Sequence, residues 1–162
     1  MKRYINYIKY LIRHKWFVYR AGEMLGVSNR RLLLHDISKL KAREFFAYAN
    51  CFYAEDGSGQ YKPTIYFDLA WNYHQKDNPH HWQYWVLIMD SGEVKPMPMD
   101  AEYIREMVAD WAGAGRAING KWEVKEWYHK NKHKMILHDH AEVGYLMRCI
   151  SASSEQCVQD LS

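Results

Sequence analysis

Residues 28–40 read SNRRLLLHDISKL, and this stretch decides the fold because it ends an apolar helical run on a histidine and an aspartate. Ser28 is a preferred N-cap residue, so we expect a helix with its three leucines buried. Packing of that helix would hold His35 and Asp36 at the edge of the core. A buried carboxylate needs a partner, which either a metal ion or a neighbouring arginine could supply.

Apolar residues on both sides of this stretch also recur at helical spacing, and no segment shows the period-two alternation of a strand. The sequence therefore predicts an all-α fold. The expected helices cover residues 3–25, 29–40, 41–54, 63–76, 101–112, 121–133 and 140–150, with 80–89 as a short helix or a buried segment. Glycine and proline predict breaks at 55–60, 78–79, 90–99 and 113–120.

Length and composition are those of one globular domain. The chain has 162 residues, of which 48% are hydrophobic and 25% charged, which is enough for one core. We assign residues 1–150 to a helical metal-binding domain and 151–162 to a polar C-terminal tail. The 7 Trp, 13 Tyr and 5 Phe residues suit a core that surrounds a polar pocket.

The charge and the cysteines of the chain limit which ligands and which cellular location are expected. The net charge of +3 is scattered, which argues against a dedicated nucleic-acid surface and suits a small anionic substrate. The three cysteines form no CxxC pair, so we expect reduced thiols in a cytoplasmic protein. Charges interrupt the N-terminal segment, which predicts neither a signal peptide nor a membrane span.

A dense group of histidines is the next candidate for chemistry. His74, His80 and His81 flank the Asn78-Pro79 break and lie among tryptophans and tyrosines, which implies partial burial. Imidazole is a common ligand of transition metals. The alternative is a patch of surface histidines.

His14 and Asp110 complete the set of candidate ligands. His14 lies on a mostly apolar helix face, where a lone histidine is usually a core residue. Asp110 repeats at a spacing of four with Glu102 and Glu106, which on its own indicates a solvated acidic stripe. A carboxylate near a helix C-terminus opposes the helix dipole, and a nearby cation would relieve that repulsion.

The order His14, His35-Asp36, His74, His80-His81, Asp110 resembles the HD-domain superfamily of metal-dependent phosphohydrolases. HDISK at 35–39 resembles the HDxGK signature of the HD-GYP branch, with serine in place of the glycine. Over about residues 10–116, the words LLLHDISKL, EFFAY, AWNYHQKDNPHHWQYW and EMVADW also resemble a family of small proteins from bacteria and phages. The resemblance implies a single compact HD-domain-like helical bundle.

The same resemblance implies roles for these residues. Asp36 would bridge two metals, the first held with His14, His35 and Asp110, the second with His74 and either His80 or His81. Asp36 and Lys39 would be catalytic, and Lys39 and Arg116 would bind the phosphate of the substrate. The implied cofactor is one or two ions of Mn, Fe, Co, Ni or Zn, with Mg as a further option.

The implied function is hydrolysis of a small phosphorylated substrate such as a nucleotide. The GYP motif of the HD-GYP branch is absent, so specificity for cyclic dinucleotides does not carry over. Related nucleotidases have a glutamate where this chain has Lys39, so their proposed acid catalyst does not carry over either. An HD-type diiron oxygenase is the second hypothesis, and a non-enzymatic metal-binding or host-interaction protein is the third. Residues 80–85 could line either a pocket or a homodimer contact.

Overall fold

The computed structural model describes residues 1–159, and it confirms the all-α class. Its helices are α1 (Lys2–Met24), α2 (Asn29–Leu34), α3 (Ala42–Phe52), α4 (Ile65–Asp77), α5 (Ala101–Asn119), α6 (Val124–Asn131) and α7 (His140–Gln159). The 3-10 turns η1 (Ile37–Leu40), η2 (Trp82–Trp85) and η3 (Lys132–Lys134) and the strands β1 (Val86–Ile88) and β2 (Val94–Pro96) connect them. Within the described residues, no helix combines the length and apolarity that crossing a bilayer requires.

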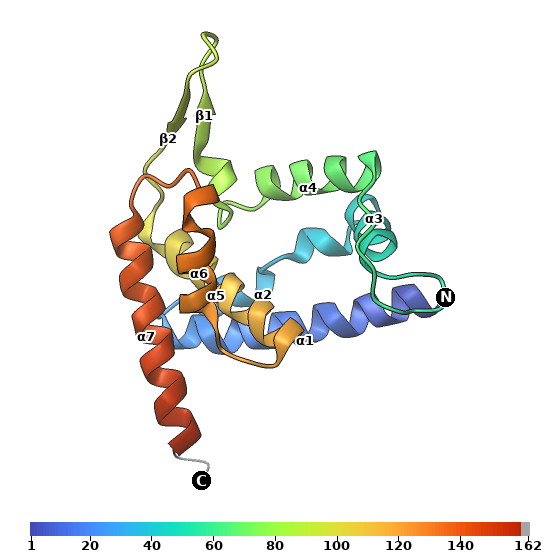
Figure 1. Cartoon of the computed structure of the whole chain (residues 1–162), viewed down its shortest axis with the longest axis horizontal. Helices are drawn as coiled ribbons and strands as arrows, with labels where there is room; N and C mark the ends of the chain where they lie inside the picture. The colour runs from blue at the N-terminus through green and yellow to red at the C-terminus, as the bar shows by residue number, and fades with distance from the viewer. Residues whose placement is uncertain (160–162) are drawn as a thin grey trace.

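Helix α1 is the base on which the other elements are assembled (Figure 1). In that view α3 lies near its N-terminal end, while α5, α6 and α7 gather at its other end. Helix α4 runs on the side opposite α1, and the β1–β2 hairpin projects away from the helices.

The buried apolar residues form two separate clusters along α1. The larger one joins the second half of α1 to α2, α5, α6 and α7, and includes Val18, Leu32 and Met107. The smaller one joins the first half of α1 to α3 and α4, and includes Tyr7 and Tyr48. Burial of apolar surface in these clusters therefore holds the helices on either side of a gap between the two.

A histidine lies on the buried stripe of α1 where the two clusters meet. The stripe is Tyr7, Leu11, His14, Val18 and Ala21, a spacing of three and four that follows one helix face. His14 is 1% exposed, so polar side chains must complete the interior at this level.

The predicted single helix over residues 29–40 is wrong. Helix α2 ends at Leu34, and Asp36 takes a left-handed backbone conformation with φ 55° before η1 begins. Leu32 is buried, but Leu33 and Leu34 are 64% and 52% exposed, because the short helix presents only one face to α1.

The predicted break at 113–120 is also wrong, because α5 continues to Asn119. Gly113 lies where α5 crosses α1, and a Cβ atom there would be 2.5 Å from the Val18 nitrogen. The glycine therefore permits a close helix contact rather than a turn. The helix ends at Gly120, whose φ of 73° is the left-handed conformation of a C-terminal glycine.

Two further expectations need correction. Residues 80–99 were expected to contain no strand, yet Val86 pairs with Pro96 and Ile88 with Val94 in an antiparallel hairpin. The helix expected over 140–150 is longer than predicted, because α7 continues without a break to Gln159. Residues 160–162 lie outside the described part of the chain.

We predict opposite effects for alanine at two glycines of α5. Gly113→Ala places a methyl group against the backbone of α1 and should lower the free energy of unfolding by about 1–3 kcal/mol. Gly115→Ala meets no atom within 4 Å and should raise it by up to about 1 kcal/mol through helix propensity. Urea unfolding followed by circular dichroism measures both, and equal effects would contradict the packing role of Gly113.

Candidate metal centre

All seven predicted ligands come together in the gap between the two apolar clusters. They are carried by α1, by the turn between α2 and η1, by α4, by the segment before η2, and by α5. Two groups of potential ligand atoms share Asp36, and within each group these atoms lie within 4.8 Å of one another. The first group is His14, His35, Asp36 and Asp110; the second is Asp36, His74, His80 and His81.

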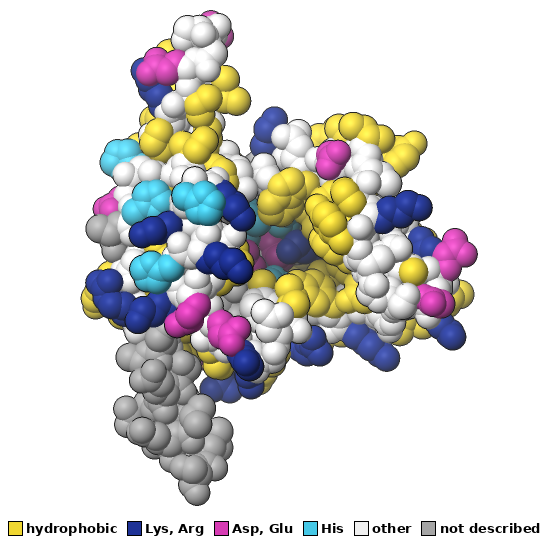
Figure 2. All heavy atoms as spheres, in the orientation of Figure 1, with side chains coloured by type: hydrophobic (Ala, Val, Ile, Leu, Met, Phe, Trp, Pro, Cys, Tyr) yellow, Lys and Arg dark blue, Asp and Glu magenta, His cyan; other side chains and the backbone are white. Residues whose placement is uncertain are grey.

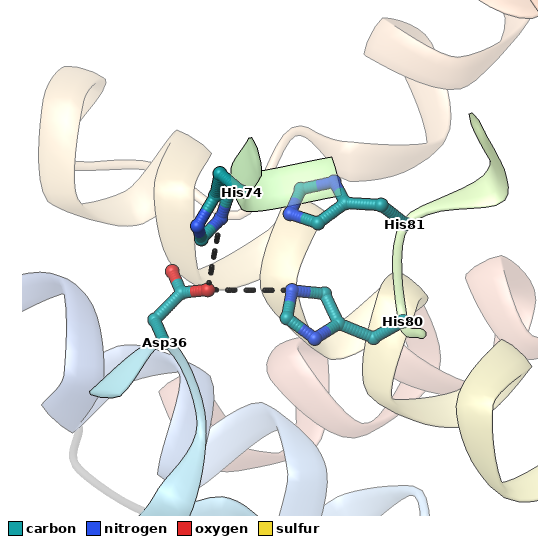
Figure 3. A group of neighbouring side chains, drawn as sticks. All are labelled: Asp36, His74, His80 and His81. Atoms are coloured by element: carbon teal, nitrogen blue, oxygen red, sulfur yellow. Dashed lines mark ion pairs between the residues drawn. The ribbon is translucent and has the colours of Figure 1, made fainter. Parts of the chain in front are cut away.

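The two carboxylate oxygens of Asp36 face different groups. Oδ2 lies 3.2 Å from Nε2 of His14 and 3.4 Å from Nε2 of His35. Oδ1 lies 3.2 Å from Nε2 of His74 and 3.4 Å from Nε2 of His80 (Figure 3). Asp110 closes the first group, with Oδ1 3.2 Å from His14 and 3.3 Å from His35.

These separations match those between two ligands of one ion. Nitrogen and oxygen ligands at about 2.1 Å from a common ion in tetrahedral or octahedral geometry lie roughly 3.0–3.4 Å apart. The orphaned polar atoms of the second group favour the same interpretation. Asp36 Oδ1 and Nε2 of His74, His80 and His81 are buried and make no hydrogen bond within the described structure. Buried polar atoms without a partner are rare, and a cation would satisfy all four.

The backbone at Asp36 turns its carboxylate into this gap. Aspartate adopts the left-handed conformation more readily than most residues, although at some cost, and such conformations cluster at functional sites. Lys15 Nζ donates to the carbonyl oxygens of Leu33 and His35 at 3.1 and 2.6 Å, which anchors the chain just before the turn to α1.

A second layer of side chains orients His74. Its Nδ1 lies 2.9 Å from Oε2 of Glu44, which is fully buried. Ser38 Oγ donates to the same oxygen at 2.9 Å, and Asn78 donates to Ser38 at 2.9 Å. Because the carboxylate accepts a hydrogen bond from Nδ1–H, Nε2 of His74 is presented to Asp36.

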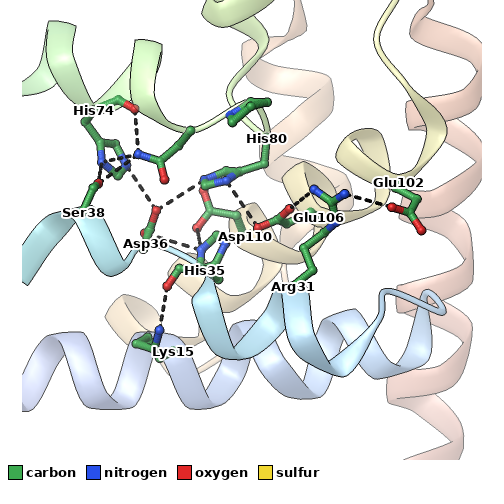
Figure 4. A network of polar contacts seen from close by, with 12 residues as sticks. Lys15, Arg31, His35, Asp36, Ser38, His74, His80, Glu102, Glu106 and Asp110 are labelled. Atoms are coloured by element: carbon green, nitrogen blue, oxygen red, sulfur yellow. Dashed lines mark hydrogen bonds and ion pairs between the residues drawn. The ribbon is translucent and has the colours of Figure 1, made fainter.

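Glu106 plays the same part for His35 (Figure 4). Its Oε1 lies 2.9 Å from Nδ1 of His35 and 3.4 Å from Nδ1 of His80, while Arg31 joins Glu106 to Glu102. The expectation of a solvated acidic stripe is therefore wrong for Glu106, which is 4% exposed. Spacing on α5 could not reveal this role, because its partners come from α2 and from the segment before η2.

In the first group, the charges of the carboxylates and of the neighbouring histidines and lysine shift one another's pKa values. Burial alone would raise the pKa of Asp36, but the charges of His35 and Lys39 hold it well below its usual range. Burial alone would lower the pKa of His35, but the Asp36 charge and hydrogen bonds with Asp110 raise it well above the usual range. The pKa of Asp110 is also depressed, against the effect of burial, by hydrogen bonds from His14 and His35.

The histidines of the second group differ among themselves. Burial alone would lower the pKa of His74, but the neighbouring carboxylates of Asp36 and Glu44 raise it. Burial, together with the nearby His35, lowers the pKa of His80, and burial with the nearby His80 lowers that of His81 much further. His80 and His81 are therefore neutral at neutral pH, which is the form of imidazole that binds a metal.

Of the two predicted phosphate-binding residues, only one lies at the centre. Lys39 Nζ is ion-paired with Asp36 Oδ2, and its side chain is 12% exposed. The predicted phosphate contact of Arg116 is not supported by its position. Its guanidinium donates to the Gly120 carbonyl and lies over the rings of Phe17 and Trp122. It stands about 9 Å further along α5 than Asp110, where it closes the helix end.

The polar cluster lies at the bottom of a hollow. Figure 2 shows acidic, basic and histidine side chains deep between hydrophobic walls. A second opening, a cavity of about 440 Å³, reaches the cluster at His35 and His80 and carries Arg30 and Arg31 on its wall. Arg31 is already paired with two glutamates, so Lys39 is the cation that faces the centre.

Residues 3–148 match a family model described as "Family of unknown function (DUF5662)". The chain belongs to DUF5662. All seven candidate ligands and Lys39 lie inside the matched region. No curated protein and no solved structure matches the chain. Because the family description names no activity, the HD-domain resemblance stays a prediction.

We predict that Glu44→Gln weakens metal binding. The substitution keeps the shape of the side chain but removes the charge that polarises His74, so affinity should fall about 10- to 100-fold. Glu102→Gln is the matched control, because Glu102 touches only the exposed end of the same network. Competition with a chromophoric chelator measures both, and equal affinities in the two variants would contradict the orienting role of Glu44.

Metal binding should release protons. The pKa values of His35 and His74 are raised, so in the ion-free chain both imidazoles hold a second proton more strongly than a free histidine does, and a metal ion must displace that proton. Affinity should therefore rise with pH from about 6 to 8. Calorimetric titration with manganese(II) at pH 7 in two buffers of different ionisation enthalpy measures the release; identical heats would argue against it.

Proposed function

We propose that this DUF5662 chain is a metal-dependent hydrolase of small phosphorylated substrates, acting in the cytoplasm. The observation that carries the proposal is the sharing of Asp36 between two complete sets of ligand atoms, one on each carboxylate oxygen. His14, His35 and Asp110 would hold the first ion with Asp36. His74, His80 and His81 would hold the second.

The donor set suits divalent transition metals. Imidazole and carboxylate accept Mn, Fe, Co, Ni and Zn, whereas Mg prefers a site made of oxygen atoms. A closed structural zinc site would have four ligands and usually cysteine, and this cluster offers seven side chains without a thiol. A pair of such ions activates water and stabilises charge on a phosphoryl group.

Phosphate ester hydrolysis requires a cation that meets the phosphoryl oxygens, and Lys39 supplies it. In the chain alone its ammonium group pairs with Asp36 Oδ2, the oxygen that also faces His14 and His35. A metal ion held by Asp36 would share this oxygen with the ammonium group, which would then be able to donate to a phosphate oxygen. The reaction forms a bond from water oxygen to phosphorus, and the ester oxygen leaves as an alcohol that carries a proton.

Two substitutions separate metal binding from substrate binding. Asp36→Asn keeps a residue that tolerates the left-handed conformation but removes the shared charge, so metal content and phosphate release should both be lost. Lys39→Met should keep the metal, because all seven candidate ligands remain and the cation that pairs with Asp36 is removed, and it should lower phosphate release at least about 100-fold through loss of the phosphate contact. Elemental mass spectrometry and a colorimetric phosphate assay with added manganese measure the two properties.

The metal analysis also tests the alternatives. The proposal is supported if the unsubstituted protein holds close to two equivalents of metal ion per chain and the Asp36→Asn variant holds none. Iron as the bound metal, with oxygen uptake and no phosphate release, would favour the diiron oxygenase. If the purified chain holds less than a tenth of an equivalent and takes up no manganese, iron or zinc, the metal-dependent function is wrong.

A further inference from the structure

A cavity of about 360 Å³ lies on the α1 face next to the metal centre, and the proposed reaction does not use it. Its walls come from α1, α3, the loop after α3, and α5. Most of them are aromatic or aliphatic, and the one formal charge among them is on Arg13, whose guanidinium also donates to the Ala117 carbonyl. The lining residues are Tyr7, Tyr10, Arg13, Phe52, Tyr53, Gly59, Ala117 and Ile118.

A row of nearly parallel rings connects this cavity to the centre. Tyr48, Tyr7, Tyr10 and His14 follow one another with centroid separations of 6.3, 6.4 and 5.8 Å and interplanar angles of 22°, 19° and 16°. The last ring belongs to a candidate metal ligand. The cavity wall and the candidate ligand His14 therefore belong to one packed row of rings, and an aryl group in the cavity would contact its aromatic side chains.

The centre is slightly exposed, and two of its charged residues lie close to Tyr10 of the cavity wall. Lys39 and Asp110 have side chains 12% and 11% exposed, whereas those of Asp36, His35 and His74 are at most 1% exposed. Tyr10 is close enough to feel the charges of Lys39, Asp110 and Asp36, and burial is the main cause of its raised pKa. Lys39 also lies 5.9 Å from the Tyr48 ring, at the start of the row.

The hydroxyl group of Tyr7 lacks a partner. Tyr7 is 1% exposed, and its hydroxyl makes no hydrogen bond within the described structure. A buried donor of this kind is costly unless a ligand or water satisfies it. The hydroxyl oxygen itself is buried and feels the charges of Lys39 and Asp36, so it belongs to the side of the cavity wall that faces the polar centre.

We propose that this cavity receives an apolar aryl group of the substrate while the anionic group of the same molecule meets Lys39. The inference rests on the proposed function and narrows it to aryl phosphate esters and similar amphiphilic phosphoesters. An apolar wall stabilises an aryl ring through surface burial but offers few partners to the hydroxyl groups of a sugar. A sugar phosphate without an aromatic group is therefore disfavoured.

The first test compares two phosphate esters. 1-Naphthyl phosphate should bind the purified, metal-analysed protein at least about tenfold more tightly than ribose 5-phosphate, because only the naphthyl group buries apolar area in the cavity. Isothermal calorimetry measures both affinities, and phosphate release is followed separately. Equal affinity, including failure of both to bind, would overturn the inference.

A pair of matched variants locates the binding. Ile118, on the cavity wall, and Ile65, on α4, are 66% and 65% exposed, so asparagine is tolerated at either position without loss of core packing. Ile118→Asn should weaken 1-naphthyl phosphate about three- to tenfold and leave ribose 5-phosphate unchanged. Ile65→Asn should change neither, and equal weakening by both variants would overturn the inference.

The outcomes separate the cavity from the reaction. If 1-naphthyl phosphate binds in an Ile118-dependent way but is not hydrolysed with any divalent metal, the proposed function fails and the cavity assignment stands. If ribose 5-phosphate and 1-naphthyl phosphate are hydrolysed with the same KM, and Ile118→Asn changes neither, the function stands and the cavity assignment fails.

Discussion

The rest of the structure depends on the burial of one carboxylate, that of Asp36. An ionised group removed from water is costly unless opposite charges and hydrogen bonds surround it. Here the compensating groups come from α1, α4, η1 and the segment before η2, so these elements must be held in a fixed relation for the carboxylate to be satisfied. The two apolar clusters on α1 supply that relation, one on each side of the polar centre.

This arrangement explains why the apolar interior is divided. A continuous core would leave no room for the imidazole and carboxylate groups, and His14 replaces an apolar residue at the level where they meet. Glu44 and Glu106 then extend the polar layer outward, where they accept hydrogen bonds from the Nδ1 atoms of His74 and His35. The ligand atoms are thus oriented by packing and hydrogen bonds, and the positions of α3 and α5 are as important to the centre as the ligands themselves.

The surroundings of the centre differ on its two sides. Toward α2 the wall is polar, with Arg31 neutralised by two glutamates. Toward the first half of α1 the wall is a row of aromatic rings, and Tyr10 in that row lies close to the charges of Lys39 and Asp110. Because of this contrast, an amphiphilic phosphoester can place its phosphate at Lys39 and its apolar part against the aromatic rings in only one orientation.

The sequence by itself determined the all-α class, most helix positions and the set of side chains that gather around Asp36, because helical periodicity and ligand type are local properties. It could not place what depends on contacts between distant segments. Gly113 looked like a break until α1 was seen against it, and Glu106 looked solvated until His35 was seen to reach it. Arg116 looked like a phosphate ligand, but the end of α5 holds it elsewhere. Only the tertiary structure decided these cases, since close approach, burial and the row of rings arise from residues far apart in the chain.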